Sequence, residues 1–181
     1  MRKLIASGLR DPDMRQASLA VAGGDKWTIN DFTRRHGYKT MNLNGLREVE
    51  ARDDIGELRN VYRFTKDNVR YSGDITGVDT YTLARRTLFE MHNGDCDDSL
   101  VSIGTMLGHN GFGVVARCIA QKGVRDMKGR PVIGHIYALA LIPKFAPQAG
   151  IALDATLPLG DLGTEVEADR VHSLVPTGTS K

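Results

Sequence analysis

The chain has 181 residues, a length at which one hydrophobic core is common, so we expect a single compact domain. Its 24 basic and 22 acidic side chains give a net charge of +2, which is too small to indicate nucleic-acid binding. Apolar residues make up 41% of the chain, but none of their runs approaches the roughly 20 residues of a membrane-spanning helix or the length of a secretory signal. We therefore expect a cytoplasmic protein with neither nucleic acid nor membrane as a partner.

Helices are expected in the first part of the chain. An Asp-Pro pair before residue 13 and a glycine pair at its other end predict a helix over 12–23. Apolar residues at helical spacing predict another over 54–69, whereas 25–45 shows no sustained period and is left unassigned. We expect residues 1–45 to form a helical extension before the main domain.

The main domain is expected over 46–156, with an α+β fold. Glycines and aspartates after Tyr71 predict a loop, followed by extended chain or a short helix up to Gly94. A largely buried helix follows, because Leu100, Ile103 and Leu107 share one helical face. Three strands are then predicted, at 114–120, 132–142 and 151–153. The central helix should pack on this small antiparallel sheet, and residues 157–181 read as a polar C-terminal tail.

The start of the central helix combines features that a thiol nucleophile needs. Asp95 is expected to cap the helix, with Asp98 completing a capping box, so Cys96 lies near the first helical position. The free first-turn amides and the helix dipole favour a thiolate and can hold an oxyanion. Asp97 and its acidic neighbours oppose a thiolate, so a nearby imidazolium is required.

His135 and Asp154 are the residues that can complete such a site. His135 lies in a strongly apolar strand, and Asp154 ends the next strand, where an ionised carboxylate needs a partner. Taken singly, His135 reads as a structural hydrogen bonder and Asp154 as a turn former. Together with Cys96 they have the roles of nucleophile, base and orienting residue.

Three motifs in chain order carry a family resemblance. GDCDDSLVSIGTMLGHNGFGVVARCIA, GHIYALALI and IALDAT resemble the transglutaminase-like superfamily of papain-like thiol enzymes, whose cysteine, histidine and aspartate match Cys96, His135 and Asp154. The upstream VRYSGD and RRTL segments are similar to members from bacteriophage and prophage gene clusters. The sequence departs from the family where Gly150, Ile151 and Ala152 stand in place of the common tryptophan, and where Ala155 follows the aspartate in place of proline.

The resemblance implies a papain-like fold without metal or cofactor, acting on carboxamides through a cysteine thioester. Hydrolysis of a peptide or isopeptide bond and transfer to an amine both fit, with a peptide or protein as substrate. A phage protein of this kind would work in the host cytoplasm or in the virion. Candidates for a further oxyanion donor or cleft residue are Trp27, Tyr71, Asn93 and Asp95.

Other functions remain open on the sequence alone. A phage assembly or virion component could keep the fold and use its surface and the tail to dock on capsid or tail proteins. Asp95, Asp97 and Asp98 could be metal ligands, although helix capping already explains two of them. Cys118 lies in an apolar strand and is expected to be a small buried hydrophobic residue, with no disulfide to Cys96.

Overall fold

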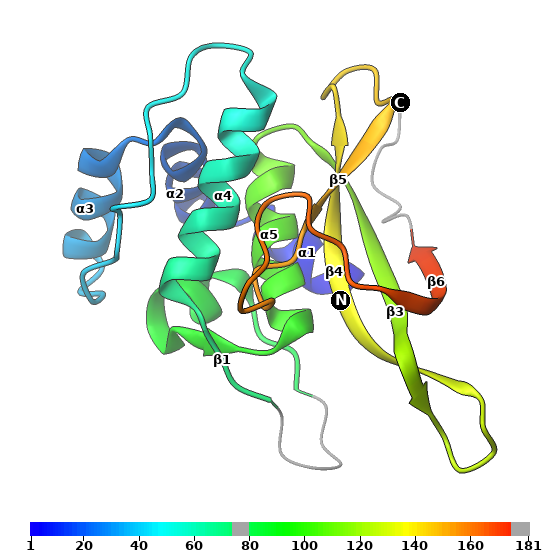
Figure 1. Ribbon diagram of the computed structural model, residues 1–181. Coiled ribbons are helices and arrows are strands. Elements are labelled where there is room, and N and C mark those ends of the chain that lie inside the picture. Colours follow the sequence, from blue (N-terminus) through cyan, green and yellow to red (C-terminus); the bar gives the residue numbers. More distant parts are fainter. Residues whose placement is uncertain (74–79, 175–181) are drawn as a thin grey trace.

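A computed structural model describes residues 1–73 and 80–174, so most of the loop expected after Tyr71 and the last seven residues lie outside the described part. The fold is α+β, as predicted (Figure 1). The elements are α1 (Arg2–Gly8), α2 (Pro12–Gly23), α3 (Lys26–Arg35), α4 (Asp54–Asn68), β1 (Arg70–Tyr71), the π-helical turn η1 (Arg86–Met91), β2 (Asn93–Gly94), α5 (Cys96–His109), β3 (Gly113–Arg125), β4 (Pro131–Ile142), β5 (Ala149–Leu153) and β6 (Ala168–Leu174).

Capping residues set the ends of the predicted helix α2. The Asp11 carboxylate accepts hydrogen bonds from the amides of Asp13 and Met14, and Pro12 opens the helix. Gly24 ends it in the left-handed region, with φ of 74°. A Cβ at Gly24 would lie 1.9 Å from the carbonyl oxygen of Arg47, so glycine is required there for space as well as for conformation.

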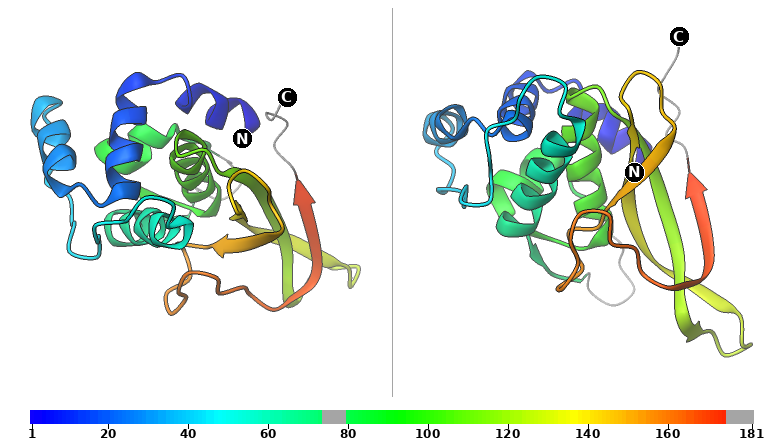
Figure 2. Two further views of the ribbon diagram at one scale, coloured as in Figure 1. Left: turned by 90° about the horizontal axis from the view of Figure 1, so that it is seen from above. Right: turned by 45° about the horizontal axis from the view of Figure 1, so that its top comes forward.

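An antiparallel sheet in the order β5-β4-β3-β6 forms the second layer, which confirms the small antiparallel sheet expected from the sequence. β3 and β4 pair over most of their length and extend beyond the other strands as a long hairpin (Figure 1). The α-helices lie on one side of this sheet (Figure 2). A two-stranded parallel pair, β1 with β2, was not predicted and joins the end of α4 to the start of α5.

The main core lies between the helices and the sheet. α5 is buried on all sides from Asp98 to Leu107, as expected for a central helix. The same core includes Met14 from α2 and Phe32 from α3, so its packing continues into the first 45 residues. None of the helices in the described part of the chain is both long and apolar enough to cross a membrane.

The segment predicted as a polar C-terminal tail, 157–181, contains a strand within its described part. Residues 168–174 form β6, which pairs antiparallel with β3 along the sheet edge opposite β5. On the way, Val166 and Ala168 pack on a second, smaller apolar cluster on the helix-free face, which includes Tyr137 and Leu139. The chain thus crosses from one edge of the sheet to the other (Figure 2). The sequence did not indicate this strand, because nearly all of its side chains are exposed and it lacks the alternation of apolar and polar residues that marks a half-buried strand.

Candidate active site

Cys96 is the first residue of α5 and is half-buried. The Asp95 carboxylate accepts hydrogen bonds from the amides of Asp97 and Asp98, at 3.2 and 3.3 Å. Asp98, three residues after Asp95, occupies the second position of the predicted capping box. Because first-turn amides lack intrahelical acceptors, the Cys96 sulfur lies at the positive end of the helix dipole.

The capping hydrogen bonds also weaken the repulsion between the neighbouring carboxylates and a thiolate at Cys96. Asp98 is buried, and it accepts a hydrogen bond of 2.7 Å from the amide of Thr82. Burial raises the pKa of the Asp98 carboxyl, which favours its neutral form. The carboxylates of Asp95 and Asp98 are therefore held by backbone amides, and Asp98 also ties the segment around Thr82 to the start of α5.

His135 and Asp154 form the pair that the sequence predicted. Asp154 Oδ2 lies 2.5 Å from His135 Nε2, and the exposed fractions of the two side chains are only 2% and 9%. Asp154 Oδ1 accepts from the Thr156 amide at 3.2 Å and from the Thr156 hydroxyl at 2.6 Å. The Asp154 carboxylate thus stabilises the local turn with one oxygen and contacts His135 with the other. Both roles that the sequence suggested for it, turn former and histidine partner, are present.

The imidazole of His135 joins Asp154 to Cys96. Burial lowers the pKa of His135, but the hydrogen bonds to Asp154 and then to Cys96 raise it more, so that it reaches about 9. Asp154 occupies Nε2, which leaves Nδ1 for the Cys96 thiol. At neutral pH the imidazole is therefore cationic, and its charge stabilises a thiolate beside it.

A second set of contacts supports the histidine from the helix-free face. The ring of Tyr137, two residues along β4, lies 5.8 Å from the His135 ring. The Tyr137 hydroxyl donates to Glu165 at 3.4 Å. Glu165 also accepts two hydrogen bonds of 2.6 Å from Arg117, the residue opposite Tyr137 on β3. The segment between β5 and β6 thereby packs against β4 next to His135.

Of the further cleft candidates, the structure brings Tyr71 and Asn93 to the site but not Trp27. Tyr71 pairs with Gly94 across β1 and β2, two residues before Cys96. Burial raises the pKa of the Tyr71 hydroxyl, and the negative charge of Cys96 raises it further. Asn93 lies next to Gly94 in β2, and the Oδ1 oxygen of its side-chain amide is buried and without a partner among the described residues.

Trp27 lies in the first turn of α3, where 76% of its surface is exposed. It lines a surface pocket with Gly24 and Leu46 that contains no residue of the Cys96 site. The helix α3 is separated from the sheet by the other helices (Figure 1). Trp27 is therefore not a cleft residue. The sequence could not reveal this, because no pattern in the unassigned segment 25–45 indicated which way its side chain faces.

Cys118 is a free thiol, as expected, but like Cys96 it is only half-buried. It lies opposite Ile136 on β4, the neighbour of His135. Burial raises the pKa of its thiol, and the negative charge of Cys96 raises it as well. Its protonated form is thus favoured, and it provides an internal comparison for the reactivity of Cys96.

The three aspartates at the start of α5 form the one cluster in the described residues whose ligand atoms could surround a metal ion, with all of these atoms within 4.8 Å of one another. Asp95 and Asp98 are already committed to backbone amides. Helix capping explains the cluster without an ion, so we assign no metal to it, and a metal-free site stays a prediction.

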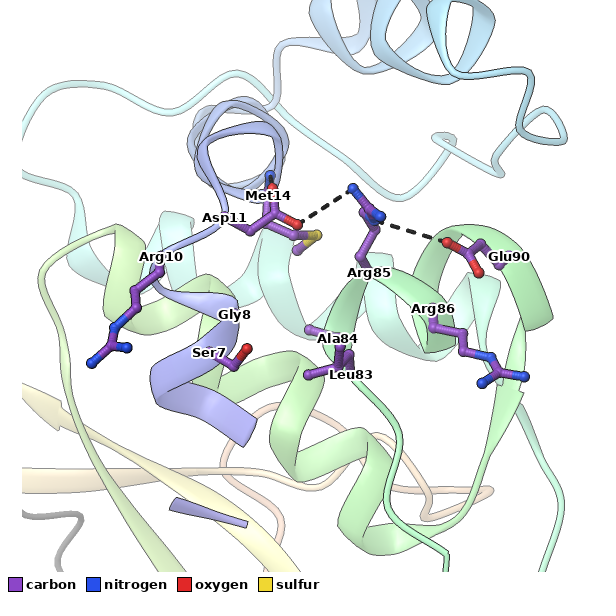
Figure 3. Close-up of a pocket in the computed structure, with 10 residues that line it drawn as sticks. All are labelled: Ser7, Gly8, Arg10, Asp11, Met14, Leu83, Ala84, Arg85, Arg86 and Glu90. Atoms are coloured by element: carbon purple, nitrogen blue, oxygen red, sulfur yellow. Dashed lines mark hydrogen bonds and ion pairs between the residues drawn. The ribbon is translucent and has the colours of Figure 1, made fainter. Parts of the chain in front are cut away.

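A pocket of about 360 Å³ lies elsewhere, between the α1–α2 junction and η1 (Figure 3). Its central cation, Arg85, points toward Asp11 at 3.6 Å and pairs with Glu90 at 3.8 Å. Arg10 and Arg86 extend away from it in different directions (Figure 3). Because the charge of Arg85 is already neutralised by Asp11 and Glu90, we assign no ligand to this pocket.

Comparison with known proteins adds no relative: no family model, no curated protein and no solved structure matches the chain. A function for the chain must therefore be inferred from the geometry of Cys96, His135 and Asp154 and from the motifs that contain them.

Proposed function

We propose that this chain is a papain-like thiol enzyme of the transglutaminase-like type. It would be a hydrolase or acyltransferase that acts on carboxamide bonds of a peptide or protein. The observation that carries the proposal is the buried contact of 2.5 Å between His135 and Asp154, with Cys96, at the first turn of a buried helix, close enough to raise the pKa of the same imidazole. The similarity of the upstream VRYSGD and RRTL segments to phage and prophage members supports a phage-encoded protein that acts in the host cytoplasm or in the virion.

The chemistry follows from the roles of the three side chains. The Cys96 sulfur attacks the carbonyl carbon, and first-turn amides, including that of Cys96, stabilise the oxyanion. The C–N bond breaks as the His135 imidazolium donates its proton to the leaving amine. Water or a second amine then attacks the thioester, His135 accepts the proton, and the thiolate is released. Asp154 keeps the imidazole oriented throughout.

An acyl donor that needs no peptide recognition tests this proposal. With p-nitrophenyl acetate, we expect an acetyl group on Cys96 by peptide mass spectrometry, with p-nitrophenol released faster than by a free thiol. Cys96→Ala should abolish both, whereas the matched variant Cys118→Ala should retain both. Partition of the acetyl group between water and an added primary amine separates a hydrolase from a transferase. Equal turnover by wild type and Cys96→Ala would refute a catalytic role for Cys96.

A further inference from the structure

Three hydrogen bonds from one lysine hold the chain just after the orienting aspartate. Lys66, in the last turn of α4, donates to the carbonyl oxygens of Leu157 and Gly160, at 2.8 and 2.5 Å. Its third hydrogen bond goes to the hydroxyl of Tyr62, at 3.0 Å, and that hydroxyl donates to Gly160 at 2.7 Å. The ammonium thus uses its whole donor capacity, and two of its acceptors are loop carbonyls far along the chain.

The held segment is short and closed at both ends. Thr156, which donates both hydrogen bonds to Asp154 Oδ1, immediately precedes Leu157. Farther along, the amide of Gly163 donates to the carbonyl of Ala152 in β5, at 2.9 Å. Only one turn of backbone therefore separates the carbonyl held by Lys66 from the Asp154 carboxylate, and hydrogen bonds restrain this turn at both ends.

We propose that Lys66 is a positioning residue: it holds the turn after β5 so that Asp154 points at His135. This inference deepens the proposed function and rests on it for its catalytic meaning. A lysine in the last turn of a helix also interacts favourably with the helix dipole, but that interaction needs only the charge and not the loop carbonyls. The two roles therefore differ in what a change at Lys66 does to His135.

Two substitutions on the same helix separate positioning from general stability. Lys66→Met keeps most of the side-chain length and removes all three donors. Arg63→Met, the matched control, removes an exposed ion pair of 3.2 Å between the same helix and Asp161 in the same loop. For Lys66→Met we expect the pKa of His135, followed by NMR, to fall by at least about one pH unit and Cys96 acetylation to slow about tenfold or more. Arg63→Met should change neither.

The outcomes distinguish the two claims. A lower melting temperature for Lys66→Met with the His135 titration unchanged would overturn the positioning role, as would equal shifts in both variants. If Lys66→Met does not fold, Tyr62→Phe removes only the hydroxyl and should lower the His135 pKa in the same direction by less; no shift there would also overturn the claim. If wild type is never acetylated at Cys96 but Lys66→Met still lowers the pKa of His135, positioning stands and the proposed enzymatic function fails.

Discussion

His135→Ala is expected to slow the alkylation of Cys96 by iodoacetamide at neutral pH at least about 100-fold, while the folded state persists. The thiolate is the reacting form of cysteine. In the wild type the imidazolium of His135, whose pKa is about 9, lies beside Cys96 and stabilises that form by its charge. Without it, only the helix dipole remains, and it is opposed by acidic neighbours in the first turn.

Peptide mass spectrometry after a low dose of reagent measures this effect, with circular dichroism as the check on folding. Cys118 is an internal reference, because it should be alkylated slowly and equally in both proteins. His172→Ala is the matched histidine variant, since His172 is exposed on β6 opposite Cys118 and should leave the Cys96 rate unchanged. Equally slow labelling of Cys96 in wild type and His135→Ala would count against a thiol active site.

Asp154→Asn is expected to lower the pKa of His135 from about 9 to near or below its ordinary value of 6.5. Burial favours the neutral imidazole, and the carboxylate is the main group that offsets this effect. The change corresponds to a loss of about 3 kcal/mol of interaction with the imidazolium. Because the neutral histidine no longer stabilises the thiolate or protonates the leaving amine, acetylation of Cys96 at neutral pH should fall with it.

Asp161→Asn is the control for this substitution, since Asp161 lies in the same loop and forms an exposed ion pair with Arg63. Its carboxylate also accepts a hydrogen bond from the amide of Leu162, which an asparagine oxygen can still accept. Its His135 titration should match that of the wild type. If Asp154→Asn left the pKa of His135 near 9, the cationic imidazole would have another source, and the orienting role of Asp154 would be lost.

Much of the candidate site could be predicted from the sequence because its signals are local. The N-cap of α5 depends on residues three positions apart, and the strands bearing His135 and Asp154 are strongly apolar runs. Pairing two buried, otherwise costly polar residues then predicted the contact between those strands. The periodicity of α4 and the cap of α2 were likewise short-range patterns.

The features that were missed depend on distant or exposed residues. α3 begins at an Asp25 cap and buries Ile29 and Phe32, a helical signal that the surrounding charges and glycines obscured. β6 has no apolar face of its own and is defined by its pairing with β3. The contacts of Lys66 join residues 91 and 94 positions apart, which no spacing within one element can indicate.

The coupling of Cys96 to His135 is tested most directly by titrating His135 by NMR before and after Cys96 is converted to its carbamidomethyl derivative. The free protein should titrate at about 9, because both Asp154 and Cys96 favour the imidazolium. Alkylation removes the thiol hydrogen bond and the negative charge, so the pKa should fall by at least about one pH unit. An identical His135 titration in the free and alkylated proteins would contradict a single site made of Cys96, His135 and Asp154.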